Sequence, residues 1–242
     1  MKFTAAREQL LPSATHIEKI AGKAKDLPIL SCVYFRVEGE QLCVRGTNLE
    51  VGVEYTVAVK DGEDGEVAVA ANVFAQIITA APSGSTVVCE KKDQVLVVRV
   101  AGSVARVALH DAQEFPVIPQ VEDPVDVRLP AQALVTVLKN VAGYTSLSTI
   151  KPELASVFVQ VDGGELIAAA TDSFRLAEKR VGIPNGVECE PFLIPARSIQ
   201  DVLHILENET GEVVITRNSH QFAIVRSGVY ATFRLTSGNF PA

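Results

Sequence analysis

The second half of the chain repeats the first at a spacing of 124 to 125 residues. Three pairs of segments carry the match: residues 37–42 with 161–166, Gly46-Thr47-Asn48 with Ala170-Thr171-Asp172, and Glu114-Phe115-Pro116 with Asn239-Phe240-Pro241. Self-similarity at a fixed spacing is the signature of a repeated structural unit. The 242 residues therefore predict two domains of one fold, residues 1–123 and 124–242, which meet near Asp123-Pro124.

Each half contains two segments whose apolar residues follow the i, i+3, i+4, i+7 spacing of an amphipathic helix. The positions are Leu10, Ser13, Ala14 and Ile17, then Phe74, Ile77, Ile78 and Ala81, and in the second half Leu134, Val137, Leu138 and Val141, then Ile199, Val202, Leu203 and Leu206. Proline is costly inside a helix and tolerated in its first turn. Pro12 therefore leaves the start of the first helix open.

Alternating apolar residues predict strands between and after these helices. Val33, Phe35 and Val37 share one face in the first half, as do Val157, Val159 and Val161 in the second. Gly39-Glu40 and Asp162-Gly163-Gly164 predict hairpin turns. A unit of this order buries its core only when both helices lie on one face of the sheet. The prediction is an α+β fold, a tandem repeat of domains that each pack two helices on one face of antiparallel sheets.

The charge balance counts against a protein that binds nucleic acid by bulk electrostatics. The net charge is −7, with 12 basic against 17 acidic residues up to Asp123 and 10 against 12 from Pro124 onward. Affinity of that kind needs Lys and Arg side chains that neutralise phosphates. The chain also has no Trp, which disfavours a base-stacking platform. Any contact with DNA must therefore be local or geometric.

Signatures of catalysis and of metal binding are absent from the sequence. It contains no G-x-S-x-G, phosphate-loop, G-x-G-x-x-G or H-E-x-x-H motif. The four histidines do not cluster; they are His16, His110, His204 and His220. The four cysteines lie far apart without a C-x-x-C pair, as expected of reduced thiols; they are Cys32, Cys43, Cys89 and Cys189. The acidic run at residues 61–66 lacks calcium-loop spacing. We therefore expect no catalytic residue, no metal and no cofactor.

The apolar runs of the chain are short. None approaches the ~20 residues that span a bilayer, and no apolar signal-peptide stretch follows Met1. We therefore expect a cytoplasmic protein with no membrane partner.

Several ordered motifs run along both halves of the chain. They are Leu27-Pro28-Ile29-Leu30-Ser31, Gly46-Thr47-Asn48-Leu49-Glu50 and Glu114-Phe115-Pro116, then Thr171-Asp172-Ser173-Phe174-Arg175-Leu176-Ala177, Leu193-Ile194-Pro195-Ala196-Arg197 and Gly238-Asn239-Phe240-Pro241. In this order they resemble the first two domains of the bacterial sliding clamp family, the beta subunit of DNA polymerase III. The resemblance implies a processivity factor that encircles duplex DNA and tethers the replicative polymerase. Members of the family carry three such domains and close as a dimeric ring, so we expect a two-domain fragment that lacks the third clamp domain.

The resemblance also implies which residues contact DNA. A ring around DNA is retained by topology, so a mildly basic lumen is enough and net acidity is no objection. The family places its DNA-contacting residues at or next to Lys23, Lys25, Lys151 and Arg197. Arg7, Lys19 and Lys139 are further lumen candidates, and for any single residue a solvated helix face is an equal alternative. The chain departs from the family at Pro152-Glu153, where tyrosine-type residues are usual.

A second implied function is the docking of short peptides from DNA polymerase III, clamp-loader subunits and other proteins with a clamp-binding motif. The residues that match the second-domain wall of the docking cleft are Leu154, Thr171, Phe174, Arg175, Leu176 and Pro241. Leu154 and Leu176 can equally belong to the core, and Thr171 to a turn. An aromatic residue beside an Arg after a turn is typical of an exposed peptide anchor. The family usually has Gly-His in place of Ser173-Phe174, and with only one wall present we expect weak peptide binding.

The family also implies a homodimeric ring, in which an edge strand of the first domain meets the third domain of a neighbour. Here that strand contains Val107 and Leu109. One alternative from another class is a duplicated protein-interaction module that never encircles DNA. An enzyme is the remaining alternative, and it would need a cleft of converging titratable groups that no motif supplies.

Overall fold

The computed structural model describes residues 1–22, 27–184, 188–207 and 209–241. The chain divides into two compact units, Met1–Pro119 with Gly228–Tyr230, and Gln120–Ser227 with Ala231–Ala242. Among the described residues, no helix combines the length and the apolarity needed to cross a bilayer.

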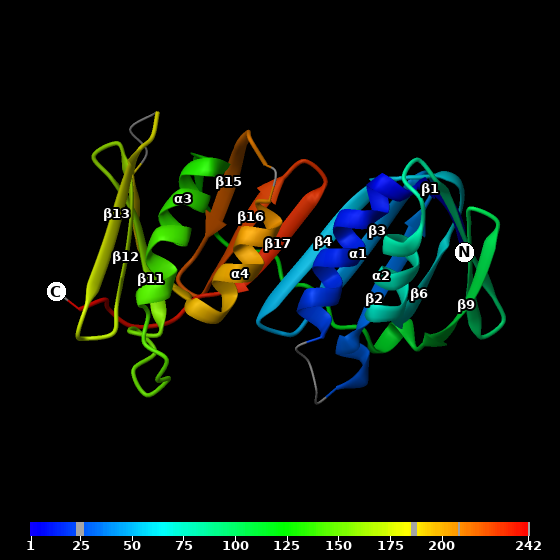
Figure 1. Ribbon diagram of the computed structural model, residues 1–242, viewed down its shortest axis with the longest axis horizontal. Helices are drawn as coiled ribbons and strands as arrows, with labels where there is room; N and C mark the ends of the chain where they lie inside the picture. The colour runs from blue at the N-terminus through cyan, green and yellow to red at the C-terminus, as the bar shows by residue number, and fades with distance from the viewer. Residues whose placement is uncertain (23–26, 185–187, 208, 242) are drawn as a thin grey trace. The chain divides into compact units, whose positions relative to one another are not determined.

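The first unit follows the predicted order of strand, helix, strands, helix, strands (Figure 1). Its elements are β1 (Lys2–Ala6), α1 (Arg7–Ala21), β2 (Cys32–Glu38), β3 (Gln41–Thr47), β4 (Val51–Ala58), β5 (Lys60–Glu63), β6 (Gly65–Ala70), α2 (Ala71–Ala80), β7 (Thr86–Lys92), β8 (Val95–Val100) and β9 (Ser103–His110), with short 3-10 turns η1 (Pro28–Ser31) and η2 (Ala112–Glu114).

The second unit has the same order. Its elements are β10 (Val125–Pro130), α3 (Ala131–Val141), the 3-10 turn η3 (Ala142–Tyr144), β11 (Ser156–Asp162), β12 (Glu165–Thr171), β13 (Leu176–Gly182), β14 (Cys189–Pro195), α4 (Ala196–Ile205), β15 (Glu212–Arg217), β16 (Gln221–Arg226) and β17 (Val229–Arg234).

The two units share their strand topology. Neighbouring strands run β4-β3-β2-β6 and β9-β8-β7-β1 in the first unit, and β13-β12-β11-β14 and β17-β16-β15-β10 in the second. The predicted hairpin turns join β2 to β3 and β11 to β12, and Gly39 and Gly163 take the same left-handed φ of 56° there. The repeat seen in the sequence is therefore a repeat of topology.

The predicted helix stripes face the core. In the first unit Leu10, Ile17, Phe74 and Ile78 are fully buried, and the Phe74 ring packs edge-on against Phe35 with centroids 4.7 Å apart. In the second unit the buried positions include Leu134, Leu138, Ile199 and Val202. Each unit thus carries its two helices on one face of its sheets, the α+β arrangement expected (Figure 1). Removal of these side chains from water is the main driving force for the packing.

The first helix begins five residues before Pro12, so this proline lies in the second turn and not in the first. Two contacts hold the early start: the N–H of Arg7 donates to the Ser85 carbonyl at 2.9 Å, and the N–H of Ala6 donates to the Gln9 side chain at 3.1 Å. Pro12 itself is exposed. The tertiary contact therefore extends the helix beyond the point that proline chemistry alone favours.

The last segment of each unit packs back on its sheet through one aromatic pair. The rings of Tyr34 and Phe115 lie 5.2 Å apart in the first unit, and those of Phe158 and Phe240 lie 5.2 Å apart in the second. The two pairs are related by the same spacings of 124 and 125 residues. The Glu-Phe-Pro and Asn-Phe-Pro motifs therefore have a structural role in closing each unit.

Candidate functional site

The turn between β12 and β13 is organised by the side chain of Asp172. Its Oδ1 accepts hydrogen bonds from the backbone N–H groups of Phe174 and Arg175, each at 3.0 Å. The Thr171 hydroxyl donates to the Arg175 carbonyl at 2.8 Å and accepts from the N–H of Ser173 at 3.1 Å. Ser173 adopts a left-handed φ of 76°. These local bonds replace the sheet ladder and fix the turn in one shape.

The corresponding turn of the first unit has the same scaffold. The Thr47 hydroxyl donates to the Val51 carbonyl at 2.8 Å, and Asn48 Oδ1 accepts from the N–H groups of Glu50 and Val51 at 3.0 and 2.8 Å. Leu49 has a left-handed φ of 71°. The turn geometry is therefore a property of the repeated fold, and the side chains that it presents distinguish the two copies.

Arg175 links the turn of the second unit to the turn η3. Its Nε donates to Asp172 Oδ2 at 2.9 Å, its Nη2 lies 3.5 Å from the Gly143 carbonyl, and its guanidinium lies 5.2 Å from the centre of the Tyr144 ring. The hydrogen bond from Arg175, followed by those from the backbone, lowers the pKa of Asp172 to about 2, and the same pair raises the pKa of Arg175. Arg175 is therefore held in place while its side chain stays largely exposed.

Apolar side chains surround this fixed arginine on the surface. Phe174 is 96% exposed and Leu176 is 65% exposed. Tyr144 is 37% exposed, and two aliphatic side chains on the following segment, Leu147 and Ile150, are almost fully exposed. Large apolar side chains gathered on one surface are typical of a docking site. We call Tyr144, Phe174 and Leu176 the apolar turn surface.

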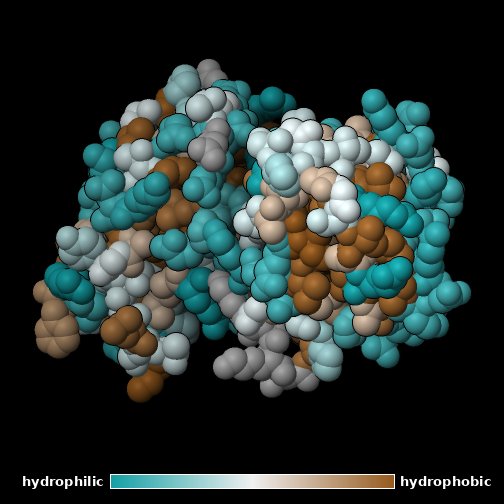
Figure 2. All heavy atoms as spheres, turned by 45° about the vertical axis from the view of Figure 1, so that its right-hand side comes forward, coloured by the Kyte–Doolittle hydropathy of each residue, from teal (hydrophilic) through white to brown (hydrophobic). Residues whose placement is uncertain are grey.

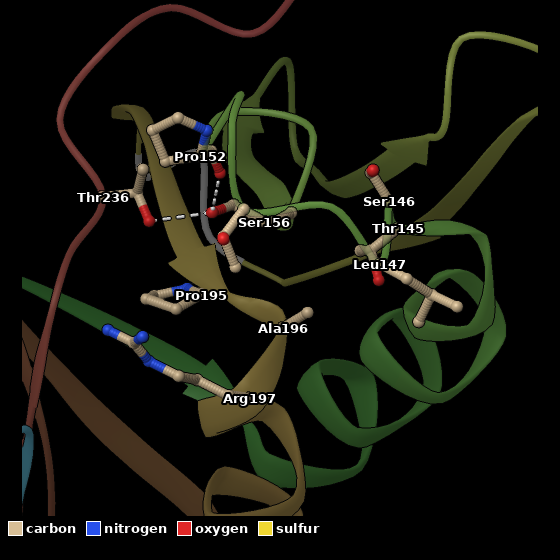
Figure 3. A pocket seen from close by; sticks show the side chains of 11 residues that line it. Thr145, Ser146, Leu147, Pro152, Ser156, Pro195, Ala196, Arg197 and Thr236 are labelled. Atoms are coloured by element: carbon tan, nitrogen blue, oxygen red, sulfur yellow. Dashed lines mark hydrogen bonds between the residues drawn. The ribbon is translucent and has the colours of Figure 1, made fainter.

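A second surface lies where the segment of residues 145–156 meets the start of α4 (Figure 3). A pocket of about 410 Å³ opens there, lined by several hydroxyl groups, and Figure 3 shows Arg197 on the first turn of α4 and Leu147 on the facing segment. The Ser156 hydroxyl donates to the Pro152 carbonyl at 2.7 Å and lies 2.8 Å from the Thr236 hydroxyl.

Backbone hydrogen bonds connect the segment that carries Lys151 with the start of α4, which carries Arg197. The N–H of Ala196 donates to the Ala155 carbonyl at 2.9 Å, and the carbonyl of Lys151 accepts from Leu154 and Ala155. Lys151 and Arg197 are both exposed. Two cations beside a helix N-terminus make a favourable environment for a phosphate.

The third surface is the edge of the first unit formed by β9. This strand pairs with β8 along residues 103–108, and with β6 only at Leu109 and His110. Val104 is 53% exposed, and Arg106 and Ala108 also face outward. Figure 2 brings the first unit forward and shows hydrophobic residues gathered on this face of it, with hydrophilic residues around them. Within the described chain, much of this strand edge is open to pairing with another strand.

Comparison with known proteins decides the family. The family model for the N-terminal domain of the DNA polymerase III beta subunit matches residues 1–119, and that for its central domain matches residues 123–242. The chain belongs to the DNA polymerase III beta subunit family. It is 27% identical over 244 residues to the beta sliding clamp of Pseudomonas aeruginosa and 26% identical over 253 residues to that of Bacillus subtilis. All of the chain and 66% of each relative are covered, so the chain spans just under two thirds of their length.

Solved structures of the family agree. The crystal structure of the DNA polymerase III subunit beta from Pseudomonas aeruginosa matches all of the chain and 66% of its own, with a TM-score of 0.90 at 27% identity. A beta subunit structure from Eubacterium rectale, at 17% identity, has a TM-score of 0.91 over 99% of the chain and 66% of its own, which shows the shared fold. The predicted family and fold are thus confirmed.

The peptide-docking residues expected for this beta subunit family differ in exposure. Phe174, Arg175 and Leu176 are exposed in one turn, and Pro241 is also exposed. Thr171 is half-buried with its hydroxyl engaged in the turn, and Leu154 is only 7% exposed. Of the two leucines that could have belonged to the core, Leu154 does and Leu176 does not. The exposure predicted for Phe174 beside Arg175 is thus confirmed.

The residues expected to contact DNA are only partly described. Lys151 and Arg197 are both exposed, on segments joined by backbone hydrogen bonds, whereas Lys23 and Lys25 lie outside the described residues. Arg7, a lumen candidate, is instead tied to α2, because its Nε donates to the Ile78 carbonyl at 3.1 Å. Its side chain is only 15% exposed. Arg7 therefore has a structural role at the junction of the two helices.

The two residues expected to make the ring contact on β9 differ in exposure. Val107 is 6% exposed and points into the core, and Leu109 is half-buried. The exposed positions of β9 include Val104, Arg106 and Ala108, which the sequence pattern did not single out. Tyr144, Leu147 and Ile150 were not predicted either, because isolated apolar residues in a Ser- and Thr-rich segment have no period that reports their exposure.

Proposed function

We propose that this chain forms two clamp domains, residues 1–123 and 124–242, of a sliding clamp that encircles duplex DNA and tethers DNA polymerase III to it. The support is the family membership together with a duplicated α+β unit whose surfaces match both roles. In this proposal the protein binds and does no chemistry. It acts in the cytoplasm, as a head-to-tail homodimeric ring in the form that carries a third domain.

The DNA role assigns Lys151 and Arg197, with Lys23 and Lys25, to non-specific phosphate contacts. Weak contacts of this kind suit a ring that must slide, because each exposed cation contributes a modest, salt-sensitive attraction. A net charge of −7 keeps the remaining surface from adding to that attraction.

Reversal of these charges tests the DNA role in the assembled ring. We expect Lys151→Glu with Arg197→Glu to shorten retention on a closed circular DNA after loading, and addition of Lys23→Glu and Lys25→Glu to shorten it further. Lys91→Glu is the matched control, since Lys91 is an exposed cation on β7, outside the proposed contact set. Unchanged retention in the fourfold variant would remove the DNA assignment.

The partner role assigns the apolar turn surface to polymerase, clamp-loader and other clamp-binding peptides. Phe174 carries this proposal, because a large aromatic side chain that is 96% exposed gains most from burial against a partner. Arg175, fixed by Asp172 and Tyr144, stands beside it as a pre-organised donor. Thr171 shapes the turn, and Leu176, Pro241 and Leu154 complete the wall.

Peptide binding by this chain measures the partner role. We expect weak binding of a clamp-binding peptide, and Phe174→Ala should weaken it by about 5- to 30-fold, as for an aromatic hot spot of ~1–2 kcal/mol. Leu49→Ala is the matched control, because Leu49 is 53% exposed on the corresponding turn of the first unit. Equal losses in both variants, or none in Phe174→Ala, would refute the assignment. Peptide binding without DNA retention in an assembled ring would favour the interaction-module alternative.

The ring role assigns the open edge of β9, with Val107 and Leu109, to a neighbouring subunit. Its strand edge offers backbone groups for pairing, and Val104 offers an exposed apolar side chain. Val104→Lys should raise the concentration at which the three-domain form assembles, as analytical ultracentrifugation can measure.

A further inference from the structure

The second unit contains another pocket, which shares one lining residue, Thr236, with the pocket at the start of α4. Its volume is about 530 Å³, and it is bounded by β14, by the turn between β15 and β16, and by the closing segment of residues 235–240. The rings of Phe158, Phe192 and Phe240 line it, together with Arg217 and His220. A concave site of this volume with aromatic walls and a few polar groups is typical of small-molecule binding.

Arg217 is a charged residue at a position that the strand pattern reserves for the core. Val213, Ile215 and Arg217 alternate as the buried positions of β15, and Arg217 is only 9% exposed. Burial of a charged side chain is unfavourable unless the charge is paired and its donors are satisfied. The contacts of this guanidinium therefore decide what the pocket can hold.

The described residues satisfy Arg217 only in part. Its Nε donates to Cys189 Sγ at 3.1 Å, and its guanidinium carbon lies 5.5 Å from the centre of the Phe192 ring. A sulfur atom is a weak acceptor. The nearest carboxylate, that of Glu190, lies 3.7 Å from Nη2, and the Glu190 side chain is 90% exposed. Arg217 is thus held by its Nε edge and ring face, while its Nη2 has one long, water-exposed partner among the described residues.

We propose that this pocket binds an aromatic or bulky apolar carboxylate, either as a free small molecule or as the C-terminal residue of a peptide. The planar guanidinium offers paired N–H donors that match a carboxylate. The three phenylalanine rings would cover the apolar body of the same ligand. This inference goes beyond the clamp function and does not depend on it.

The neighbouring groups favour a carboxylate over a phosphate. Glu190 places a negative charge beside Arg217, so a dianionic phosphate would meet stronger repulsion than a monoanionic carboxylate. The aromatic walls also suit an apolar body better than a sugar. The ligand's carboxylate would displace Glu190, whose exposed side chain can turn to water at little cost.

Titration of the whole chain with N-acetyl-L-phenylalanine, followed by NMR, tests the proposal. We expect saturable shifts at the amides of Phe192, Arg217 and His220, and at least tenfold weaker binding of N-acetyl-L-phenylalaninamide, which lacks the carboxylate. A second arm compares a short peptide that ends in phenylalanine with its amidated form. Binding of the peptide acid indicates a C-terminal residue as the source, and binding of the free acid alone indicates a small molecule.

Two substitutions with opposite expected effects on ligand affinity locate the site. Arg217→Gln should weaken binding of the acid at least tenfold, while Arg128→Gln, on an exposed position of β10, should leave it unchanged. Glu190→Gln should tighten binding several-fold because it removes the competing carboxylate, and its exposure protects the fold if Arg217→Gln is unstable. The proposal is overturned if the acid does not bind, if acid and amide bind equally, or if Glu190→Gln fails to tighten binding.

Discussion

The packing of α1 against β3 predicts that Gly46→Ala destabilises the first unit. A Cβ at position 46 would lie 2.9 Å from Cγ1 and 3.0 Å from Cβ of Ile17, and closer still to its Cγ2. These atoms belong to a β-branched side chain, whose χ1 is restricted in a helix, so they cannot move aside easily. The added methyl group must therefore push α1 away from the sheet.

Two opposing effects set the size of this change in stability. Overpacking of a core costs about 1–3 kcal/mol. Gly46 does not have a left-handed φ, so alanine at this position also stabilises by ~0.4–1 kcal/mol through the lower entropy of the unfolded chain. The cost of overpacking exceeds this gain, and we expect a net loss of about 1–2 kcal/mol in the free energy of unfolding.

Urea unfolding followed by circular dichroism measures this loss, with Gly182→Ala as the control. Gly182 is also a strand glycine, without a left-handed φ, and a Cβ there meets nothing within 4 Å, so its replacement should be neutral or slightly stabilising. Ile17→Ala removes Cγ1 and Cγ2, the two closest of these atoms, and should itself cost ~2–5 kcal/mol. In the double variant the new methyl group fills part of that cavity, so the losses should fall short of their sum by about 1–3 kcal/mol. Additive losses, or a Gly46→Ala variant as stable as the wild type, would refute the reasoning.

Three further predictions rest on titratable groups. The pKa of Asp172 is lowered to about 2 by Arg175, so the turn order that its carboxylate supports is complete above pH ~4 and is lost as the pH falls toward 2; amide shifts of the turn in an NMR pH titration check this. Burial, and after it the hydrogen bond to Glu66, raises the pKa of Tyr34 to about 12. The stability that its neutral phenol contributes is therefore present below pH ~10 and is lost as the pH rises toward 12. Tyr34→Phe should remove one late step from an ultraviolet absorbance titration. Burial raises the pKa of the Cys43 thiol to about 11, and it also raises the pKa of the fully buried Cys89 thiol. At about pH 8 a thiol reagent should therefore label Cys43 slowly and Cys89 only after unfolding.

Periodicity predicted the elements well because it reports burial. The four helix stripes bury the positions that face the sheets, and the Gly39 and Gly163 turns lie where hairpins were expected. The start of α1 was harder to predict, because the contacts of Arg7 with Ser85 and Ile78 join segments more than 70 residues apart in the sequence. A local pattern carries no information about such contacts.

The candidate site could be predicted only where local chemistry implied exposure. Phe174 beside Arg175 after a turn was such a case. Leu154 and Leu176 could not be separated by sequence, because one leucine at a strand end is compatible with either the core or the surface, and only the fold distinguishes 7% from 65% exposure. The position of Arg217 depends on the alternation of β15 and on Cys189, which is 28 residues away.

Comparison of the two copies of the β-turn separates structural residues from functional ones. Thr47 and Thr171 make the same hydrogen bonds, and so do the side-chain oxygens of Asn48 and Asp172, so these positions preserve the turn and need no partner to explain them. The residues three positions after Asn48 and Asp172 differ in exposure. Val51 is buried in the first unit, whereas Arg175 is exposed in the second and is held by an ion pair. A fold-stabilising role would favour the same residue in both units. The difference between the copies therefore supports a role for Arg175 toward a partner that meets only the second unit.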